Sequence, residues 1–333
     1  MLFLFNPTTT PHMLTSDDFV NGLTIREPLG NEKGYWVGCP GFFHDSDTGN
    51  AYLTYRIRRP RGVQPDRGGE VKIAKSTDLK NFEDIWTMEK SQVNTASIER
   101  SHLVKGKDGN WRYFTSFVDA EDGRWKTTVI KTDAPENLDV ANMKDVFKAG
   151  DLNLEGVKDP WILEVDGVYH MFLSVAQSVE STDAESHDSL DIYNTGQCVS
   201  STGLATSTDL DNWEWQGIVL APEADGWDKY CRRINSVIPR DGKYYAFYDG
   251  SASHLENYEE RNGVAVSDDL RNWTCLTPAG PNITSPNASG SLRYCDVQNV
   301  NGEIFFFYEW ARADEAHEMR LIRTNADQLP IPA

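Results

Sequence analysis

The feature that most constrains the fold is a strand–turn–strand unit that recurs along the chain. In its clearest copy, an apolar run at residues 156–165 ends at Asp166-Gly167, and a second apolar and aromatic run follows to Leu173. An Asp-Gly turn between two such runs is a strong short-range signal for a β-hairpin. Asp159-Pro160 lies early in the first run, and the start of a strand tolerates a proline.

This hairpin occurs five times, at intervals of roughly sixty to seventy-five residues, which is typical of propellers and repeat arrays. The other four turns lie at residues 45–49, 108–109, 241–242 and 301–302. A second motif, Ser-x-Asp-Leu-x-Asn-aromatic, follows three of the hairpins and begins at Ser76, Ser207 and Ser267. Its Asp and Asn side chains can bind the local backbone in a turn. Because both motifs recur in the same order, the pattern favours a propeller over the alternative, a β-sandwich.

Five repeats of about four strands each predict an all-β fold, a five-bladed β-propeller that forms one domain over residues 1–333. The last repeat has room for only three strands. We therefore expect residues 23–26 to add the fourth strand, to close the ring and to cover an exposed strand edge.

The composition of the chain limits which binding partners and which cellular compartment we expect. A net charge of −19 disfavours nucleic acids and anionic membranes as partners, and no apolar run reaches the roughly eighteen residues of a membrane helix. An odd number of cysteines without metal-ligand spacing fits a reduced cytoplasmic protein. A secreted chain whose signal peptide was removed is the alternative. No cofactor is predicted, and an axial calcium ion stays open.

The hairpins, the Ser-x-Asp-Leu-x-Asn-aromatic turns and Asp159-Pro160 together resemble the five-bladed propeller glycosidases, a group that includes glycoside hydrolase families 43, 32, 68, 117 and 130. The resemblance covers residues 38–326. It implies an oligosaccharide or polysaccharide substrate, bound at the end of the axis where the first strands begin. It also implies that Asp159 assists catalysis or stabilises the transition state.

Two positions depart from the pattern of the family-43-like enzymes. Those enzymes carry a base Asp near the start of the first blade, where this chain has Cys39-Pro40. They carry an acid Glu in the fourth blade, where this chain has Arg-Arg-Ile-Asn at residues 232–235. Glycoside hydrolysis normally needs two carboxylates, so the second one must come from elsewhere.

The replacement carboxylates are Glu99, Asp296 and Glu309. Glu99 and Asp296 each lie two residues from the position that matches Asp159 in their own repeats. Residues two apart on a strand share a face, so both side chains can face the same cavity as Asp159. A structural ion pair is the alternative role for each of the three, and a position at the opposite end of the axis is a further alternative for Glu309.

A cation precedes the Asp159 position in four of the five repeats: Arg100, Lys158, Arg233 and Arg293. If these residues surround the axis, they form a basic mouth that attracts anions, and arginine recognises carboxylate or sulfate with a planar fork. The alternative is that each cation pairs with a nearby acid, such as Glu99 or Asp296.

Other candidate site residues are His102, Tyr294 and Trp161. His102 can transfer protons near neutral pH, Tyr294 can contact the substrate or abstract a proton, and Trp161 can stack on a sugar. We interpret Arg67 and the arginines of residues 56–61 as parts of a solvated basic loop. The polar insertion at residues 178–188 is interpreted as a solvated acidic loop, with a lid as the alternative.

The first functional hypothesis is a glycoside hydrolase that acts on a uronate- or sulfate-bearing saccharide, with Asp159, Glu99, Asp296 and His102 as catalytic candidates. The second is a polysaccharide lyase, in which a basic group neutralises a uronate and His102 or Tyr294 abstracts the proton. The third is a sugar-binding propeller without catalytic activity.

Overall fold

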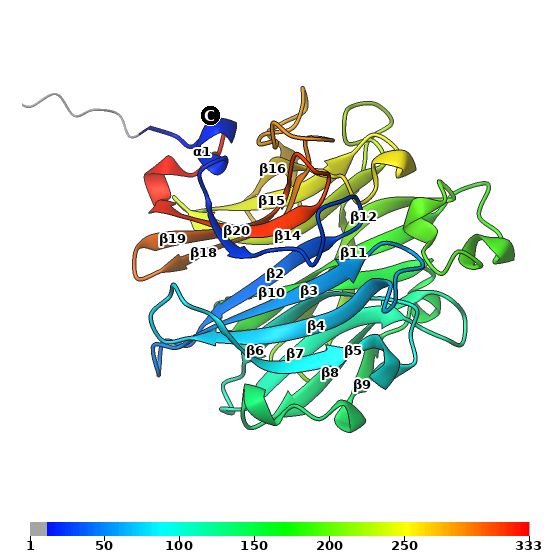
Figure 1. Ribbon diagram of the computed structural model, residues 1–333, viewed down its shortest axis with the longest axis horizontal. Coiled ribbons are helices and arrows are strands. Elements are labelled where there is room, and N and C mark those ends of the chain that lie inside the picture. The colour runs from blue at the N-terminus through cyan, green and yellow to red at the C-terminus, as the bar shows by residue number, and fades with distance from the viewer. Residues whose placement is uncertain (1–11, 333) are drawn as a thin grey trace, which may run out of the picture.

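The computed structural model describes residues 12–332, which form an almost entirely β-stranded protein (Figure 1). One short α-helix, α1 (Ser16–Phe19), precedes the first strand. Within the described part of the chain, no helix has the length and apolarity needed to cross a membrane. The strands pair as five antiparallel four-stranded groups, called units 1 to 5 below. The all-β expectation is confirmed.

The units have the following strands. Unit 1 contains β2 (Trp36–His44), β3 (Ala51–Arg59), β4 (Arg67–Ser76) and β5 (Glu83–Glu89). Unit 2 contains β6 (Ile98–Lys105), β7 (Trp111–Val118), β8 (Trp125–Thr132) and β9 (Lys144–Phe147). Unit 3 contains β10 (Gly156–Val165), β11 (Val168–Ser178), β12 (Cys198–Ser207) and β13 (Glu214–Leu220). Unit 4 contains β14 (Cys231–Arg240), β15 (Lys243–Ser251), β16 (Arg261–Ser267) and β17 (Thr274–Cys275). Unit 5 contains β18 (Leu292–Val300), β19 (Glu303–Ala311), β20 (His317–Asn325) and the N-terminal β1 (Leu23–Arg26).

Short 3-10 helices lie in the connections: η1 (Lys90–Val93), η2 (Pro135–Asn137), η3 (Val140–Asn142), η4 (Gly150–Leu152), η5 (Ala184–His187), η6 (Ile192–Asn194), η7 (His254–Glu256) and η8 (Ala326–Gln328).

Turn chemistry explains the hairpins between the first two strands of the units. In unit 3, Asp166 and Gly167 join β10 to β11 with φ values of 50° and 83°. Both central residues of this turn need positive φ, which Asp, Asn and Gly tolerate best. Asp241-Gly242 and Asn301-Gly302 also have positive φ at both positions in units 4 and 5. The predicted hairpins are therefore present at these positions.

The second motif also forms the turn that the sequence predicts. The Asp209 carboxylate accepts hydrogen bonds from the backbone N–H groups of Asp211 at 2.9 Å and Asn212 at 2.8 Å. Leu210, which lies between Asp209 and Asp211 in the sequence, is buried in a core cluster. The polar side chains thus close the turn while the leucine attaches it to the body of the protein.

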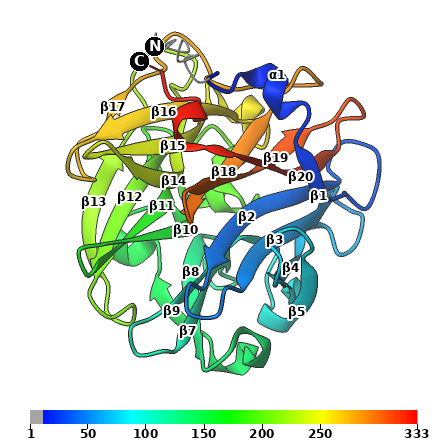
Figure 2. The same ribbon diagram turned by 90° about the vertical axis from the view of Figure 1, so that its left-hand side faces the viewer.

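The N-terminal strand supplies the fourth strand of unit 5, as the sequence predicts. Leu23 on β1 lies opposite Leu321 on β20, in antiparallel pairing, and Figure 2 shows β1 beside β20. Arg26 then donates hydrogen bonds to the Tyr55 hydroxyl at 3.1 Å and the Phe82 carbonyl at 2.7 Å. The start of the chain therefore connects unit 5 to unit 1.

The first strands of the units lie at the centre of the molecule. The first strand of each unit contacts the first strand of the next unit, in the order β2, β6, β10, β14 and β18. The last of these, β18, contacts β2. Figure 2 shows β2, β10, β14 and β18 near the middle, with β5, β9, β13 and β17 toward the periphery. Among residues 12–332, strand pairing between units occurs only at Trp36–His317 and at Ser200–Cys231. Contacts through side chains therefore hold most of the units together.

Candidate active site

Each first strand has a β-bulge or similar irregularity near the same position. The register shifts fall at residues 38–41, 98–101, 158–161, 234–236 and 293–296. A bulge bends the strand and redirects its side chains. Cys39, Asp159 and Tyr294 adopt φ values of 54°, 58° and 52° at these bulges. Non-glycine residues with such values are uncommon and concentrate at functional sites.

A cluster of buried charged residues lies at this level and draws side chains from all five units. Each of its members is at most 4% exposed. We call this set the charged cluster, and it consists of Arg56, Glu99, Lys158, Asp159, Arg233, Asp249, Glu260, Arg293 and Glu309.

Acids and cations alternate in one chain of ion pairs through six residues of the charged cluster. Arg56 pairs with Glu99 and lies 3.4 Å from Glu309. Arg293 lies 2.6 Å from Glu309 and 2.7 Å from Glu260, and Glu260 also pairs with Arg233. The predicted cations Arg233 and Arg293 therefore each have acidic partners, which is the alternative that the sequence left open.

Asp159 and Lys158 form the part of the cluster contributed by unit 3. The Lys158 ammonium lies 4.0 Å from the Asp159 carboxylate and 4.5 Å from the centres of the Trp125 and Tyr193 rings. The Asp159 carboxylate also accepts a hydrogen bond from the backbone N–H of Arg100 at 3.3 Å. The faces of Trp125 and Tyr193 therefore hold the Lys158 cation next to the carboxyl group of Asp159, which the sequence analysis predicts to be catalytic.

The two predicted carboxyl groups Asp159 and Glu99 have pKa values shifted in opposite directions. Burial raises the pKa of Asp159; Lys158 lowers it, and the charge of Glu99 adds to the increase. Burial also opposes ionisation of Glu99, but Arg56, and then Lys158 and Arg58, hold the pKa of Glu99 below its ordinary value. Paired carboxyl groups whose environments separate their pKa values can divide the roles of acid and base.

Unit 4 contributes Asp249 to a second such pair. Burial and the neighbouring Glu260 raise the pKa of Asp249 to about 7. Burial would also raise the pKa of Glu260, but Arg233 and Arg293 lower it to about 2. The Asp249 carboxylate accepts a hydrogen bond from the backbone N–H of Tyr294 at 3.0 Å. Asp249 therefore supports the positive-φ backbone near the start of β18.

Tyr294 lies next to two arginines of the charged cluster. The guanidinium groups of Arg293 and Arg56 lie over its ring, 5.0 Å and 5.9 Å from the ring centre. Burial raises the pKa of Tyr294 well above its ordinary value. The Tyr294 hydroxyl is therefore a neutral group at physiological pH.

Three other predicted site residues close the axis instead of facing the charged cluster. Arg100 donates hydrogen bonds to the Pro40 carbonyl at 2.8 Å and the Asn235 carbonyl at 2.7 Å. Its guanidinium also lies 3.7 Å from Asp296, whose carboxylate accepts a hydrogen bond from the Trp161 indole N–H at 3.2 Å. We call Arg100, Trp161 and Asp296 the axial plug, because they connect β2, β6, β10, β14 and β18 across the centre.

His102 lies on the other side of the axial plug. It lines a cavity of about 410 Å³, together with Trp161, Phe43, Tyr169, Pro239 and Gln298. Burial and the charge of Arg100 lower the pKa of His102 to about 3, so the imidazole is neutral at physiological pH. His102 therefore lines a cavity in which Asp159 and Glu99 take no part.

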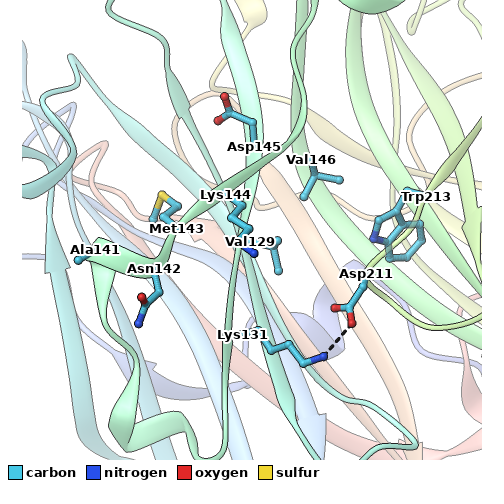
Figure 3. A pocket seen from close by; sticks show the side chains of 10 residues that line it. All are labelled: Val129, Lys131, Ala141, Asn142, Met143, Lys144, Asp145, Val146, Asp211 and Trp213. Atoms are coloured by element: carbon cyan, nitrogen blue, oxygen red, sulfur yellow. Dashed lines mark hydrogen bonds and ion pairs between the residues drawn. The ribbon is translucent and has the colours of Figure 1, made fainter.

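Another hollow lies far from the axis and contains none of the predicted site residues. Its volume is about 730 Å³, and it lies beside β8, β9 and the turn after β12. Figure 3 shows Lys131 directed toward Asp211 in this hollow, and the two side chains form an ion pair at 2.8 Å. These two charged groups of the hollow therefore already have partners.

The interpretation of residues 56–61 and Arg67 as a solvated loop is wrong for three of the arginines. Arg56, Arg58 and Arg67 are buried, whereas Arg59 and Arg61 retain contact with solvent. Arg56 and Arg58 are two apart on β3, so both point to the same face. Partners from distant parts of the chain make their burial possible.

Sequence reasoning did not recognise Arg56, Asp249 and Glu309 as one set, although a local signal marks them. Each directly follows a tyrosine within a largely apolar or aromatic run. In the structure they lie on the second strands of units 1, 4 and 5, each opposite a residue near the bulge of its first strand. A charge at the same position of three second strands could have identified the set.

The fold is similar to solved structures of glycoside hydrolases. A structure of an RGII complex matches with a TM-score of 0.66 and 18% identity, over 97% of this chain and 96% of the matched one. A thermostable family-43 glycoside hydrolase matches with a TM-score of 0.62 and 15% identity, over 90% of this chain and 92% of that chain. An endo-arabinase from Bacteroides thetaiotaomicron VPI-5482 matches with a TM-score of 0.58 and 14% identity, over 91% of this chain and 96% of that chain. These matches confirm the resemblance to the β-propeller glycosidases at the level of the fold.

Sequence comparison gives a shorter match. No protein-family model matches the chain. A stretch of 78 residues is 35% identical to sucrose-6-phosphate hydrolase from Bacillus subtilis (strain 168). This stretch is 23% of the present chain and 16% of that protein, so the chain matches only a small part of the relative's length.

Proposed function

We propose that this protein is a glycoside hydrolase that cleaves a glycosidic bond in a uronate- or sulfate-bearing oligosaccharide or polysaccharide. Its fold supports this proposal, because the similar structures include a family-43 glycoside hydrolase and an endo-arabinase. An RGII complex is also among them. Fold alone does not define an activity, so the proposal depends on the chemistry of the charged cluster.

We also propose that units 1 to 5 are the five blades of a single propeller domain, with β1 closing the ring. The contacts between successive first strands, including β18 with β2, support this arrangement. The pairing of β1 with β20 supports the closure, because it covers the outer edge of unit 5.

The observation that carries the proposal is the pair formed by Asp159 and Glu99. Both carboxyl groups are buried in the charged cluster, and the pKa of Asp159 is raised while that of Glu99 is lowered. Glycoside hydrolysis uses one protonated and one ionised carboxyl group. We assign the proton donor to Asp159 and the ionised carboxylate to Glu99.

In this mechanism Asp159 gives its proton to the glycosidic oxygen as the bond from that oxygen to the anomeric carbon breaks. In one route Glu99 attacks the anomeric carbon, and a water that gives a proton to Asp159 then displaces Glu99 from the sugar. In the other route Glu99 takes a proton from a water that attacks the anomeric carbon directly. The ion pair of Glu99 with Arg56 keeps the carboxylate charged and in place. The stereochemistry of the product distinguishes the two roles of Glu99.

The preference for an anionic substrate has support in the charge balance. When Asp159 and Asp249 are protonated, the four cations of the charged cluster outnumber its three remaining acids, Glu99, Glu260 and Glu309. A buried excess of positive charge favours a bound anion. The same balance gives Lys158, Arg233 and Arg293 a proposed role in substrate binding in addition to their ion pairs.

Hydrolysis fits the site better than the lyase alternative. A lyase needs a group that removes a proton near neutral pH. Burial raises the pKa of Tyr294 well above its ordinary value, and His102 lines a cavity on the other side of the axial plug. Neither residue is therefore well suited to act as the base beside Asp159.

Product analysis tests the proposal. The protein is incubated with pectic and sulfated polysaccharides, and the products are examined for new reducing ends and for ultraviolet absorption. New reducing ends without absorbance support hydrolysis, whereas an unsaturated, absorbing uronate identifies a lyase. Binding of the saccharides without either product identifies a sugar-binding protein. Proton NMR of the first products then gives the anomeric configuration.

We place this activity in the cytoplasm. All five cysteines are free, and four of them are buried. Cysteines without disulfide bonds suit a reducing compartment.

A further inference from the structure

Arg58 is buried between two aromatic rings at the edge of the charged cluster. It lies near the end of β3, opposite Gly68 on β4, and it is 4% exposed. Its guanidinium lies 4.3 Å from the centre of the Tyr258 ring and 5.1 Å from that of Trp36. Two aromatic rings favour a fixed, desolvated cation, so Arg58 presents its nitrogens in a defined direction.

Two nitrogens of Arg58 have no hydrogen-bond partner in the part of the chain that the structure describes. They are its Nε and one terminal nitrogen, and both are buried. A carboxylate oxygen of Glu99 is 3.8 Å from that terminal nitrogen, which is too far for a hydrogen bond. Buried donors are almost always paired in native proteins, so these two N–H groups call for an acceptor from outside the described chain.

Arg67 adds a second cation beside Arg58. It donates a hydrogen bond to the Leu190 carbonyl at 2.9 Å and lies 3.5 Å from Asp191. Its Nε is also buried without a partner among residues 12–332. Burial lowers the pKa of Arg67, and the charges of Arg61 and Arg58 contribute in the same direction. A bound anion would therefore relieve repulsion between Arg58 and Arg67 and would satisfy their unpaired donors.

We propose that Arg58, supported by Arg67, binds the carboxylate or sulfate group of a sugar next to Glu99. The planar guanidinium matches the two oxygens of such a group. Glu99 contacts both Arg56 and Arg58, so the bound anion lies beside the carboxylate that we assign to catalysis. This inference rests on the proposed function for the location of the sugar, and it names the group that selects the substrate.

Binding measurements without turnover test the subsite. The probes are galacturonate and glucuronate, their neutral counterparts galactose and glucose, and inorganic sulfate, measured by isothermal titration calorimetry. Arg58→Gln removes the guanidinium and its charge, whereas Arg58→Lys keeps the charge but not the planar guanidinium. Arg61→Gln is the matched control, because Arg61 is an exposed arginine of the same segment.

We expect at least one uronate to bind the wild type about tenfold or more tightly than its neutral counterpart, which is about 1.4 kcal/mol. Arg58→Gln should remove that preference, Arg58→Lys should weaken it, and Arg61→Gln should leave it intact. If sulfate competes with the uronate, the subsite also accepts sulfate esters. If sulfate has no effect, the subsite accepts only carboxylates. Circular dichroism establishes that each variant is folded, and Arg58→Lys carries the test if Arg58→Gln is not.

The inference is overturned if the wild type binds uronates and neutral sugars equally or binds neither, or if folded Arg58 variants keep the preference. These outcomes are separate from those of the product analysis. A protein that binds uronates through Arg58 but cleaves no glycoside would overturn the proposed function and retain the subsite. A hydrolase whose Arg58 variants keep the wild-type uronate preference would do the reverse.

Discussion

The guanidinium of Arg100 lies 3.7 Å from the carboxylate of Asp296, and this contact joins unit 2 to unit 5 across the axis. Both side chains are fully buried. Asp296 also accepts a hydrogen bond from the backbone N–H of Phe42 at 2.7 Å. The pair thus separates the charged cluster from the cavity that contains His102.

Breaking this pair should affect stability more than catalysis. Asp296→Asn keeps the shape of the side chain but leaves the Arg100 charge without its acid, and loss of one partner of a buried ion pair costs about 3–5 kcal/mol. We expect a loss near the lower value, because Arg100 also binds two carbonyl groups. Urea denaturation measures the change, and turnover per folded molecule should remain close to that of the wild type.

The control for this variant is Asp327→Asn, which alters an exposed acid paired with Arg240 at 3.6 Å. Surface pairs contribute about 0–1 kcal/mol, so its stability should hardly change. If Asp296 were itself a catalytic acid or base, Asp296→Asn would stop turnover in protein that is still folded.

The sequence predicted the hairpins well because their signals are local. Asp166-Gly167 adopts the turn that its own chemistry favours, and residues 23–26 form the strand that unit 5 lacks. The position of Asp159 beside other charges also followed from the repeat register. Local turn chemistry and repeat spacing were therefore sufficient for the main elements of the fold.

The partners of the buried charges could not be predicted in the same way. Arg58 follows Arg56 near Pro60, and such a run is usually solvated, yet Glu99, Trp36 and Tyr258 surround Arg58. Trp36 lies opposite Arg58 in the first hairpin, but Glu99 and Tyr258 belong to other units, so no local pattern links them to Arg58. Burial of a charge depends on such partners, which is why the interpretation of this segment was wrong.

Asp159→Asn tests the proposed proton donor. The amide keeps nearly the same shape but cannot donate the carboxyl proton, and general acid catalysis contributes about 10²–10⁴-fold to rate. We expect kcat to fall by about that factor while the melting temperature changes little. Initial rates on the best substrate from the product analysis, together with thermal melting, provide the measurement.

Asp166→Asn is the matched control for Asp159→Asn. Asp166 has a positive φ of 50° in the turn of the same hairpin, and asparagine tolerates that conformation. Turnover should therefore be unchanged in Asp166→Asn. Full activity of Asp159→Asn would remove Asp159 from the mechanism, and equal losses in both variants would point to damage to the hairpin.

Phe19 tests the contribution of the N-terminal segment to unit 5. Its ring is fully buried, and the centre of the ring lies 5.0 Å from that of Phe306 and 5.1 Å from that of Tyr308. The Phe19 carbonyl accepts a hydrogen bond from the Tyr308 hydroxyl at 2.7 Å. Phe19→Ala leaves a cavity, which costs about 3–5 kcal/mol. We expect a correspondingly lower denaturation midpoint and more aggregation on heating, because β20 loses support for its edge partner.

The neighbouring residue provides the control. Val20 is 41% exposed, so Val20→Ala should change the free energy of unfolding by only about 0.5 kcal/mol. Similar effects of Phe19→Ala and Val20→Ala would show that the segment before β1 contributes little to the core of unit 5.

Asp249 predicts a pH dependence of stability. Burial and Glu260 raise the pKa of Asp249 from 3.8 to about 7 in the folded protein. A raised pKa means that the folded state favours the protonated form, so the stabilisation is complete below about pH 4 and is lost as the pH rises through about 7. Asp249→Asn removes this titration, since the amide stays neutral at every pH.

The difference in stability between Asp249→Asn and the wild type should therefore grow in favour of the variant from pH 4 to pH 8. One unit of pKa shift corresponds to about 1.4 kcal/mol, so the change in this difference should reach a few kcal/mol. Urea denaturation of both proteins across this range measures it.

Asp241→Asn, at an exposed turn of the same unit, should show a constant difference from the wild type. A constant difference for Asp249→Asn as well would mean that Asp249 is ionised in the folded protein throughout this range, with Arg233 and Arg293 outweighing its burial.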